Sequence, residues 1–99
     1  MLYIFAKSPL YTQDLEHCSR MKKSKDSKVL LIEDAVIAVK KGIRTERILE
    51  KFRADGIDVY AIQADLEARG IKDIFDTIKV IDYNDFVDLV VENKIVSCM

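Results

Sequence analysis

Short apolar runs alternate with helix-compatible segments along the whole chain, and this alternation constrains the fold more than any other feature. The predicted strands are Leu2–Ala6, Val29–Ile32, Ile57–Ile62 and Ile78–Ile81, with Ile95–Cys98 as a short fifth. Strands that alternate with helices build parallel sheets, because each parallel connection must cross over the sheet. We therefore predict an α/β fold: a three-layer, doubly wound domain with a mostly parallel sheet of four or five strands and helices on both faces.

Five helical segments are predicted between these strands. The first runs from Thr12 to about Lys23, and its acidic start and basic end suit the helix dipole. The other four are expected to begin at residues that commonly cap helices, namely Asp34, Thr45, Asp65 and Asp82. The helices after Asp34 and Asp65 are short and end near Lys41 and Arg69. The last helix has apolar residues at i, i+3, i+4 and i+7 over Tyr83–Val90, the spacing of an amphipathic helix.

Three glycines stand where helices are expected to end. Gly42, Gly56 and Gly70 are each followed by isoleucine. Glycine tolerates the left-handed conformation that closes a helix, and the apolar residue after it packs back onto the last turn.

Length and charge limit the classes of protein that this chain can represent. Its 99 residues suffice for one modest core, so residues 1–99 are predicted to form a single domain. The net charge is −1, so direct binding to nucleic acid is not expected. Residues 1–49 have a balance of +4 and residues 50–99 one of −5, which either steers a partner or reflects two solvated faces.

The expected compartment is the cytoplasm. No apolar stretch is long enough to span a membrane, and Met1–Ala6 lacks the features of a signal peptide. With two cysteines and no secretion signal, a disulfide framework is not expected and the thiols should be reduced.

Most catalytic and ligand-binding motifs are missing from the sequence. No two glycines lie close together, which excludes phosphate-binding loop motifs, and no serine stands in a nucleophile-elbow pattern. One histidine, His17, and two distant cysteines do not make a zinc site of standard spacing. We therefore expect neither a cofactor nor a metal ion.

Cys18 is the leading candidate for covalent chemistry, because thiol chemistry is the only kind that the sequence supports. It follows His17 and lies close to Arg20, with Lys22 and Lys23 one turn further on. Nearby positive charge favours the thiolate, which is the form that attacks a persulfide.

An ordinary structural explanation competes with this role. Leu15, Cys18 and Met21 are three residues apart and are predicted to share an inward helical face, where a buried cysteine behaves as a small hydrophobic residue. Cys98 is interpreted either as a mobile thiol that visits a partner's site or as an inert end.

Several segments, in their order along the chain, resemble the TusB/DsrH family of sulfur-relay proteins. They are Lys7-Ser8-Pro9, Leu30-Leu31-Ile32-Glu33-Asp34, Val59-Tyr60-Ala61, Asp65-Leu66-Glu67-Ala68-Arg69-Gly70 and Ile81-Asp82-Tyr83-Asn84-Asp85-Phe86-Val87. The resemblance runs from Met1 almost to Met99. Its most specific pieces in combination are Asp-Leu-x-Ala-Arg-Gly and Asp-Tyr-x-x-Phe-Val.

The resemblance implies a DsrE/DsrF/DsrH-like α/β domain that works within an assembly. TusB proteins join TusC and TusD in a cytoplasmic complex that passes persulfide sulfur toward 2-thiolation of the wobble uridine in certain tRNAs. DsrH proteins join DsrE and DsrF in sulfur oxidation. In both systems the main sulfur-accepting cysteine is on the TusD or DsrE subunit. DsrH-type members have a cysteine early in the first helix, at the position of Cys18, and some TusB members lack it.

Two positions depart from the family pattern. Members often have a tryptophan near the C-terminus, where this chain has Ser97-Cys98. They also often have glycine where Ala35 follows Asp34, and alanine tolerates fewer backbone conformations at such a turn.

Three functions remain open on the sequence. The first is a TusB-like accessory subunit, without catalysis of its own, that packs on TusC/TusD-like or DsrE/DsrF-like partners in a sulfur-relay complex. The second is a DsrH-like persulfide carrier in sulfur oxidation that uses Cys18. The third is a small-molecule-binding or regulatory α/β domain. In isolation the chain is expected to form a homodimer, because an interface made for partners would still need cover.

Overall fold

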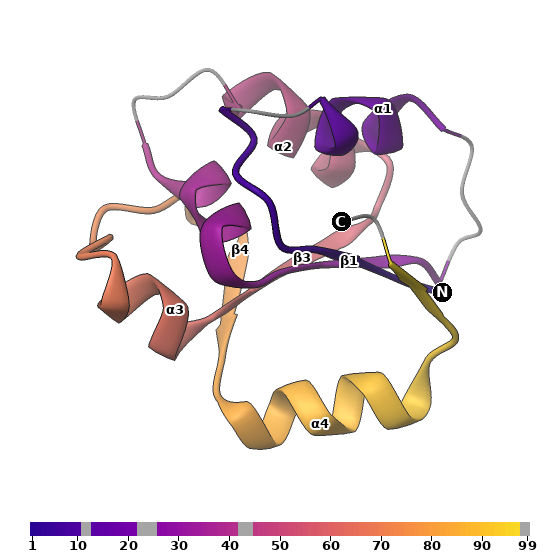
Figure 1. The fold of residues 1–99 in the computed structure, drawn as a ribbon. Helices are drawn as coiled ribbons and strands as arrows, with labels where there is room; N and C mark the ends of the chain where they lie inside the picture. Colours follow the sequence, from indigo (N-terminus) through magenta and orange to yellow (C-terminus); the bar gives the residue numbers. More distant parts are fainter. Residues whose placement is uncertain (11–12, 22–25, 42–44, 98–99) are drawn as a thin grey trace.

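Five strands form one sheet in which every neighbouring pair is parallel (Figure 1). The computed structural model describes residues 1–10, 13–21, 26–41 and 45–97. The strands are β1 (Leu2–Phe5), β2 (Lys28–Leu31), β3 (Asp58–Ile62), β4 (Ile78–Ile81) and β5 (Ile95–Ser97), in the order β4-β3-β2-β1-β5. All five predicted strands are therefore present, including the short last one.

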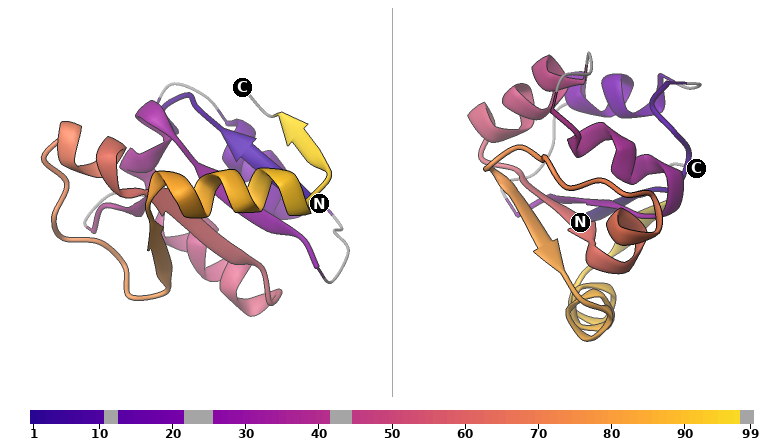
Figure 2. Two further views of the ribbon diagram at one scale, coloured as in Figure 1. Left: turned by 90° about the horizontal axis from the view of Figure 1, so that it is seen from below. Right: turned by 90° about the vertical axis from the view of Figure 1, so that its left-hand side faces the viewer.

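The direction of the connections decides which face each helix covers. The helical segments are α1 (Asp14–Arg20), the 3-10 helix η1 (Glu33–Val39), α2 (Glu46–Ala54), α3 (Gln63–Ala68) and α4 (Tyr83–Glu92). From β1 to β4 the chain moves in one direction across the sheet, and then returns to the opposite edge at β5. Because parallel crossovers are right-handed, this reversal places α4 on the face opposite α1 and α2 (Figures 1 and 2). The predicted doubly wound, three-layer fold is confirmed.

Side chains alternate along the strands between two hydrophobic cores. Tyr3 and Phe5 of β1 lie in the larger core with Phe52 of α2. Leu2, which points to the other face of the sheet, lies in the smaller core with Leu89 of α4. β1 and β2 thus bury both faces, as their uninterrupted apolar runs predict.

The sheet face under α4 is only partly covered. A helix is about 10 Å wide and strands lie about 4.8 Å apart, so one helix cannot cover five strands. The uncovered part is polar: Nζ of Lys79 lies 3.2 Å from a carboxylate oxygen of Asp58 and 5.7 Å from the centre of the Tyr60 ring. The hydrogen bond with Asp58 raises the pKa of Lys79 above its ordinary value. A lysine on an edge strand also discourages pairing with another molecule.

Of the four predicted helix caps, only Asp82 caps a helix with its side chain. Its Oδ1 accepts a hydrogen bond of 2.8 Å from the backbone N–H of Asp85. Thr45 holds the N-cap position of α2, but its hydroxyl donates to the carbonyl of Ala38 at 2.7 Å instead. The predictions for Asp34 and Asp65 are wrong. Both residues lie inside their helices, and their carboxylates bind groups far away in the sequence.

Two glycines close helices as predicted. Gly56 and Gly70 have φ of 74° and 63°, a conformation that side chains disfavour. After α2, Ile57 N–H donates to the carbonyl of Phe52 and Gly56 N–H to that of Arg53, the paired bonds of a Schellman motif. The same pair of bonds closes α3 at Gly70 and the residue after it. Gly42 lies outside the described residues.

Two predicted helices differ in extent or type. α1 covers the middle of the predicted segment, whose ends at residues 12 and 22–23 lie outside the described residues. The segment after Asp34 is a 3-10 helix that ends at Val39, because Lys40 is extended and forms a β-bridge with Ile74. None of the described helices is long and apolar enough to cross a membrane.

The Asp82 cap is open to a direct test. We expect Asp82→Ala to lower the free energy of unfolding by about 1 kcal/mol, because the N–H of Asp85 loses its acceptor. Urea unfolding measures the change. Asp82→Asn keeps a side-chain acceptor and should stay close to wild type. Equal losses in both variants would mean that the negative charge, rather than the cap, stabilises α4.

Candidate functional site

The structure places Cys18 in the interior. Its exposed fraction is 3%, and it belongs to the larger core together with Leu15 of the same helix. Met21 does not share this face as predicted, because α1 ends at Arg20 and the Met21 side chain is 54% exposed. The arrangement matches the structural explanation of Cys18, in which the thiol fills space in the core.

The basic neighbours of Cys18 within α1 lie at exposed positions. His17 is exposed, and Arg20 forms an ion pair with Glu16 one turn earlier, at an exposed position. Lys22 and Lys23 lie outside the described residues. A thiolate that attacks a persulfide must be reachable, so persulfide chemistry at Cys18 would require α1 to move away from the sheet.

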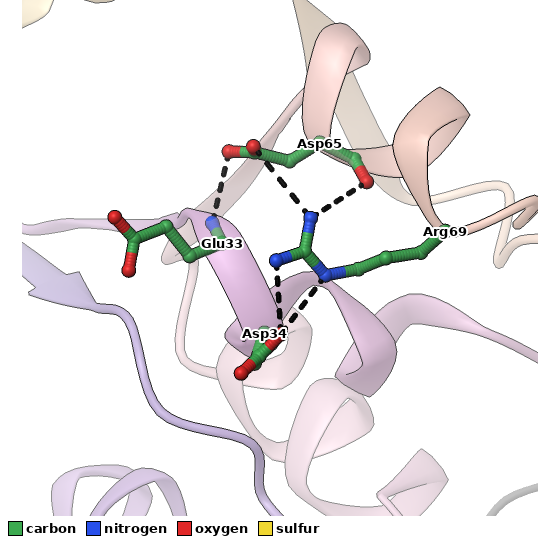
Figure 3. A network of polar contacts seen from close by, with 4 residues as sticks. All are labelled: Glu33, Asp34, Asp65 and Arg69. Atoms are coloured by element: carbon green, nitrogen blue, oxygen red, sulfur yellow. Dashed lines mark hydrogen bonds and ion pairs between the residues drawn. The ribbon is translucent and has the colours of Figure 1, made fainter.

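The residues that the structure does bring together come from two of the family-like segments. Glu33 and Asp34 follow β2, Asp65 belongs to α3, which begins directly after β3, and Arg69 is the C-cap of α3. Neighbouring parallel strands end at the same edge of the sheet, so these side chains meet there (Figure 3). We call these four residues the Arg69 network.

Arg69 holds the network together with three of its nitrogens. Nε and Nη2 donate to Oδ1 of Asp34 at 3.1 and 2.9 Å, and Nη1 donates to the carbonyl of Asp65 at 3.2 Å. The Asp65 carboxylate also lies 3.7 Å from Nη1 and accepts the backbone N–H of Glu33 at 2.8 Å. The side chains of Asp65 and Arg69 are each 27% exposed, so solvent screens this pairing less than that of a surface pair.

Glu33 contributes its backbone rather than its side chain. Its φ of 49° is the only positive φ of a non-glycine among the described residues, and its carboxylate points away from Arg69 (Figure 3). Such a conformation costs about 1–3 kcal/mol unless the surroundings hold it. The bond to Asp65 is one such restraint. The network therefore positions η1 against α3.

The departure at Ala35 does not strain the turn. Ala35 is buried in the first turn of η1, and its N–H donates to the Ala6 carbonyl at 3.2 Å and to the Ile32 carbonyl at 3.0 Å. The residue with the unusual φ is Glu33, two positions earlier. An alanine methyl is accommodated here in the larger core.

Only one of these pairings has a local signal in the sequence. The i, i+4 spacing of Asp65 and Arg69 was a usable local signal. The pairing of Asp34 with Arg69 spans 35 residues, and no local sequence pattern predicts it.

Possible ligand sites are small in the part of the chain that the structure describes. One depression, of about 280 Å³, lies between α1 and the start of α2 and is lined by Pro9, Gln13, Leu15, Glu16, Thr45, Arg47 and Ile48. Binding pockets for small molecules usually measure about 300–1,000 Å³. Among the same residues, no group of three or more His, Cys, Asp or Glu side chains is placed to hold a metal ion.

The backbone role of Glu33 can be tested with two variants. We expect Glu33→Gly to remain within about 0.5 kcal/mol of wild type, because glycine relieves the positive φ but gains freedom in the unfolded chain. Glu33→Val should lose about 1–2 kcal/mol, because a β-branched residue is strained at this φ. Urea unfolding of both variants gives the comparison. If the two lose stability equally, the Glu33 carboxylate matters and its backbone does not.

Comparison with known proteins gives consistent matches over nearly the whole chain. The family model described as DsrH like protein matches residues 7–96. Protein TusB of Photorhabdus laumondii is 38% identical over 94 residues, which is 94% of each chain. Protein TusB of Escherichia coli K12 is 39% identical over 94 residues, again 94% of each chain. Protein TusB of Buchnera aphidicola is 37% identical over 95 residues, 95% of each chain.

A solved structure supports the fold independently. The ychN protein from E. coli superposes with a TM-score of 0.78 over 97% of this chain and 96% of that one, at 17% sequence identity. At this identity the likeness concerns the fold alone. The family match, the curated relatives and the fold agree with the resemblance drawn from the sequence. The chain therefore belongs to the TusB/DsrH family.

Proposed function

We propose that this chain is a TusB-like accessory subunit of a cytoplasmic sulfur-relay complex that supports 2-thiolation of the wobble uridine in tRNA. The observation that carries the proposal is the identity of 37–39% to TusB proteins over 94–95% of both chains. An accessory role is favoured because Cys18, the only candidate nucleophile within the described residues, is buried.

The proposed partners are TusC- and TusD-like subunits. On this proposal the persulfide is accepted by a cysteine of a partner, and residues 1–99 act as one unit that packs beside it. The net charge of −1 suits a subunit that does not itself bind the tRNA. Without its partners the chain is proposed to form a homodimer.

A role for Cys18 as a DsrH-like carrier is the competing proposal. Its support is the position of the cysteine in the first helix, and its obstacle is the 3% exposure of the residue. The two proposals differ in whether the thiol reacts in the folded protein.

Thiol reactivity separates the two proposals directly. In a Cys98→Ser background, Cys18 is the sole cysteine of the chain. We expect it to take up persulfide sulfur slowly from a low-molecular-weight donor, and quickly only after unfolding in urea, because folding buries it. Mass spectrometry measures the uptake, with the variant lacking both cysteines as control. Equal rates with and without urea would favour the carrier role.

Complementation tests the proposed function itself. In an Escherichia coli K12 strain that lacks its TusB protein, we expect this chain to restore 2-thiouridine in tRNA. Cys18→Ala should restore the same amount, since alanine fills most of the space and costs about 1 kcal/mol in stability. Nucleoside analysis by liquid chromatography gives the readout, and thermal unfolding checks that the variant is folded. A folded Cys18→Ala that restores nothing, while wild type does, would contradict an accessory role.

A further inference from the structure

The outer surface of α4 is divided lengthwise into an apolar and an acidic stripe. Tyr83, Val87 and Val91, at i, i+4 and i+8, are 69%, 41% and 78% exposed. We call these three residues the apolar stripe. On the neighbouring side of the same helix, Phe86 and Leu89 pack in the smaller core, and the Phe86 ring lies 5.8 Å from the ring of Tyr83. α4 therefore has apolar side chains well beyond what its own core uses.

The second stripe is made only of carboxylates. Asp85, Asp88 and Glu92 recur at i, i+3 and i+7 and are exposed along the helix. α4 contains neither lysine nor arginine, and the cap before it is also acidic, at Asp82. No intrahelical ion pair can therefore neutralise the acidic stripe.

Resting on the proposed function, we infer that α4 is the surface on which a partner subunit docks. The partner fits if it presents an apolar surface for Tyr83, Val87 and Val91 and, beside it, a row of Lys or Arg for the acidic stripe. Apolar contact then supplies affinity, and the charges supply orientation and steering.

A second copy of this chain is a poor occupant of the same surface, so the proposed homodimer would use a different surface. If two α4 helices packed antiparallel through their apolar stripes, a two-fold axis would bring both acidic stripes to the same side of the contact. Six carboxylates would then share one edge, and like charges oppose association. The negative balance of −5 over residues 50–99 adds to this repulsion. Charge complementarity thus points to a basic partner of a different sequence.

The experiment uses the full chain co-expressed with the TusC- and TusD-like subunits of the same organism. Val91→Ser removes an apolar group that the fold does not bury, and Val80→Ser is its matched control at the exposed edge strand β4. Asp88→Lys reverses one charge of the acidic stripe, and Asp76→Lys makes the same change of charge in the loop before β4. Circular dichroism confirms that each variant is folded.

We expect Val91→Ser and Asp88→Lys each to raise the dissociation constant at least about tenfold, and the two control variants to leave it unchanged. Added sodium chloride should weaken the wild-type complex, because it screens the acidic stripe, and should weaken the Asp88→Lys complex less. Affinity capture and calorimetry measure both effects.

The alternative outcomes separate the inference from the proposed function. A wild-type complex that Val91→Ser and Asp88→Lys leave intact would overturn the docking surface and leave the proposed function standing. If Val91→Ser instead dissociates a homodimer of the isolated chain, the apolar stripe is a contact with itself and the inference is wrong. Absence of any wild-type complex would overturn the proposed function, and the inference with it.

Discussion

The right-handedness of the connection from β4 to β5 determines how the helices are divided between the two faces of the sheet. The chain leaves β4 at one edge of the sheet and must reach β5 at the other, beside β1. Four strand spacings amount to about 19 Å, and the ten residues of α4 span about 15 Å as a helix. A right-handed return therefore takes α4 over the opposite face, part of which it leaves uncovered. That helix completes the smaller core by itself, while four helical segments share the larger core.

On the sheet face that carries the larger core, the Arg69 network fixes two short helices against each other. There η1 and α3 begin at the carboxyl ends of neighbouring strands, and each is too short to be stable without tertiary contacts. Arg69 joins Asp34 to the first turn of α3, and Asp65 holds the backbone of Glu33 in a conformation that a glutamate disfavours. The family-like segments around these residues are thus explained by tertiary structure. Their charged side chains bind one another.

The sequence predicted those features that depend on neighbours along the chain. The Asp82 cap joins residues three apart, and the closures at Gly56 and Gly70 are complete within six residues. The strand pattern and family resemblance together predicted the doubly wound sheet. The failures concern groups with a choice of distant partners: Asp34 and Asp65 suit helix caps locally, but they bind Arg69 and Glu33 across 35 and 32 residues. The prediction that Met21 faces inward is wrong because α1 ends at Arg20, and the helical spacing does not extend beyond it.

Cys18 and α4 lie on opposite faces of the sheet. Cys18 belongs to the core on the α1 side of the sheet, whereas the exposed stripes of α4 lie beyond the other face. Layers in such a fold are about 10 Å apart, so a partner docked on α4 is separated from the thiol by the sheet and its cores. A persulfide carried by that partner could not reach Cys18 by any local motion of α4. Docking through α4 and sulfur transfer through Cys18 therefore make separate demands on this chain, and the accessory role needs only the first.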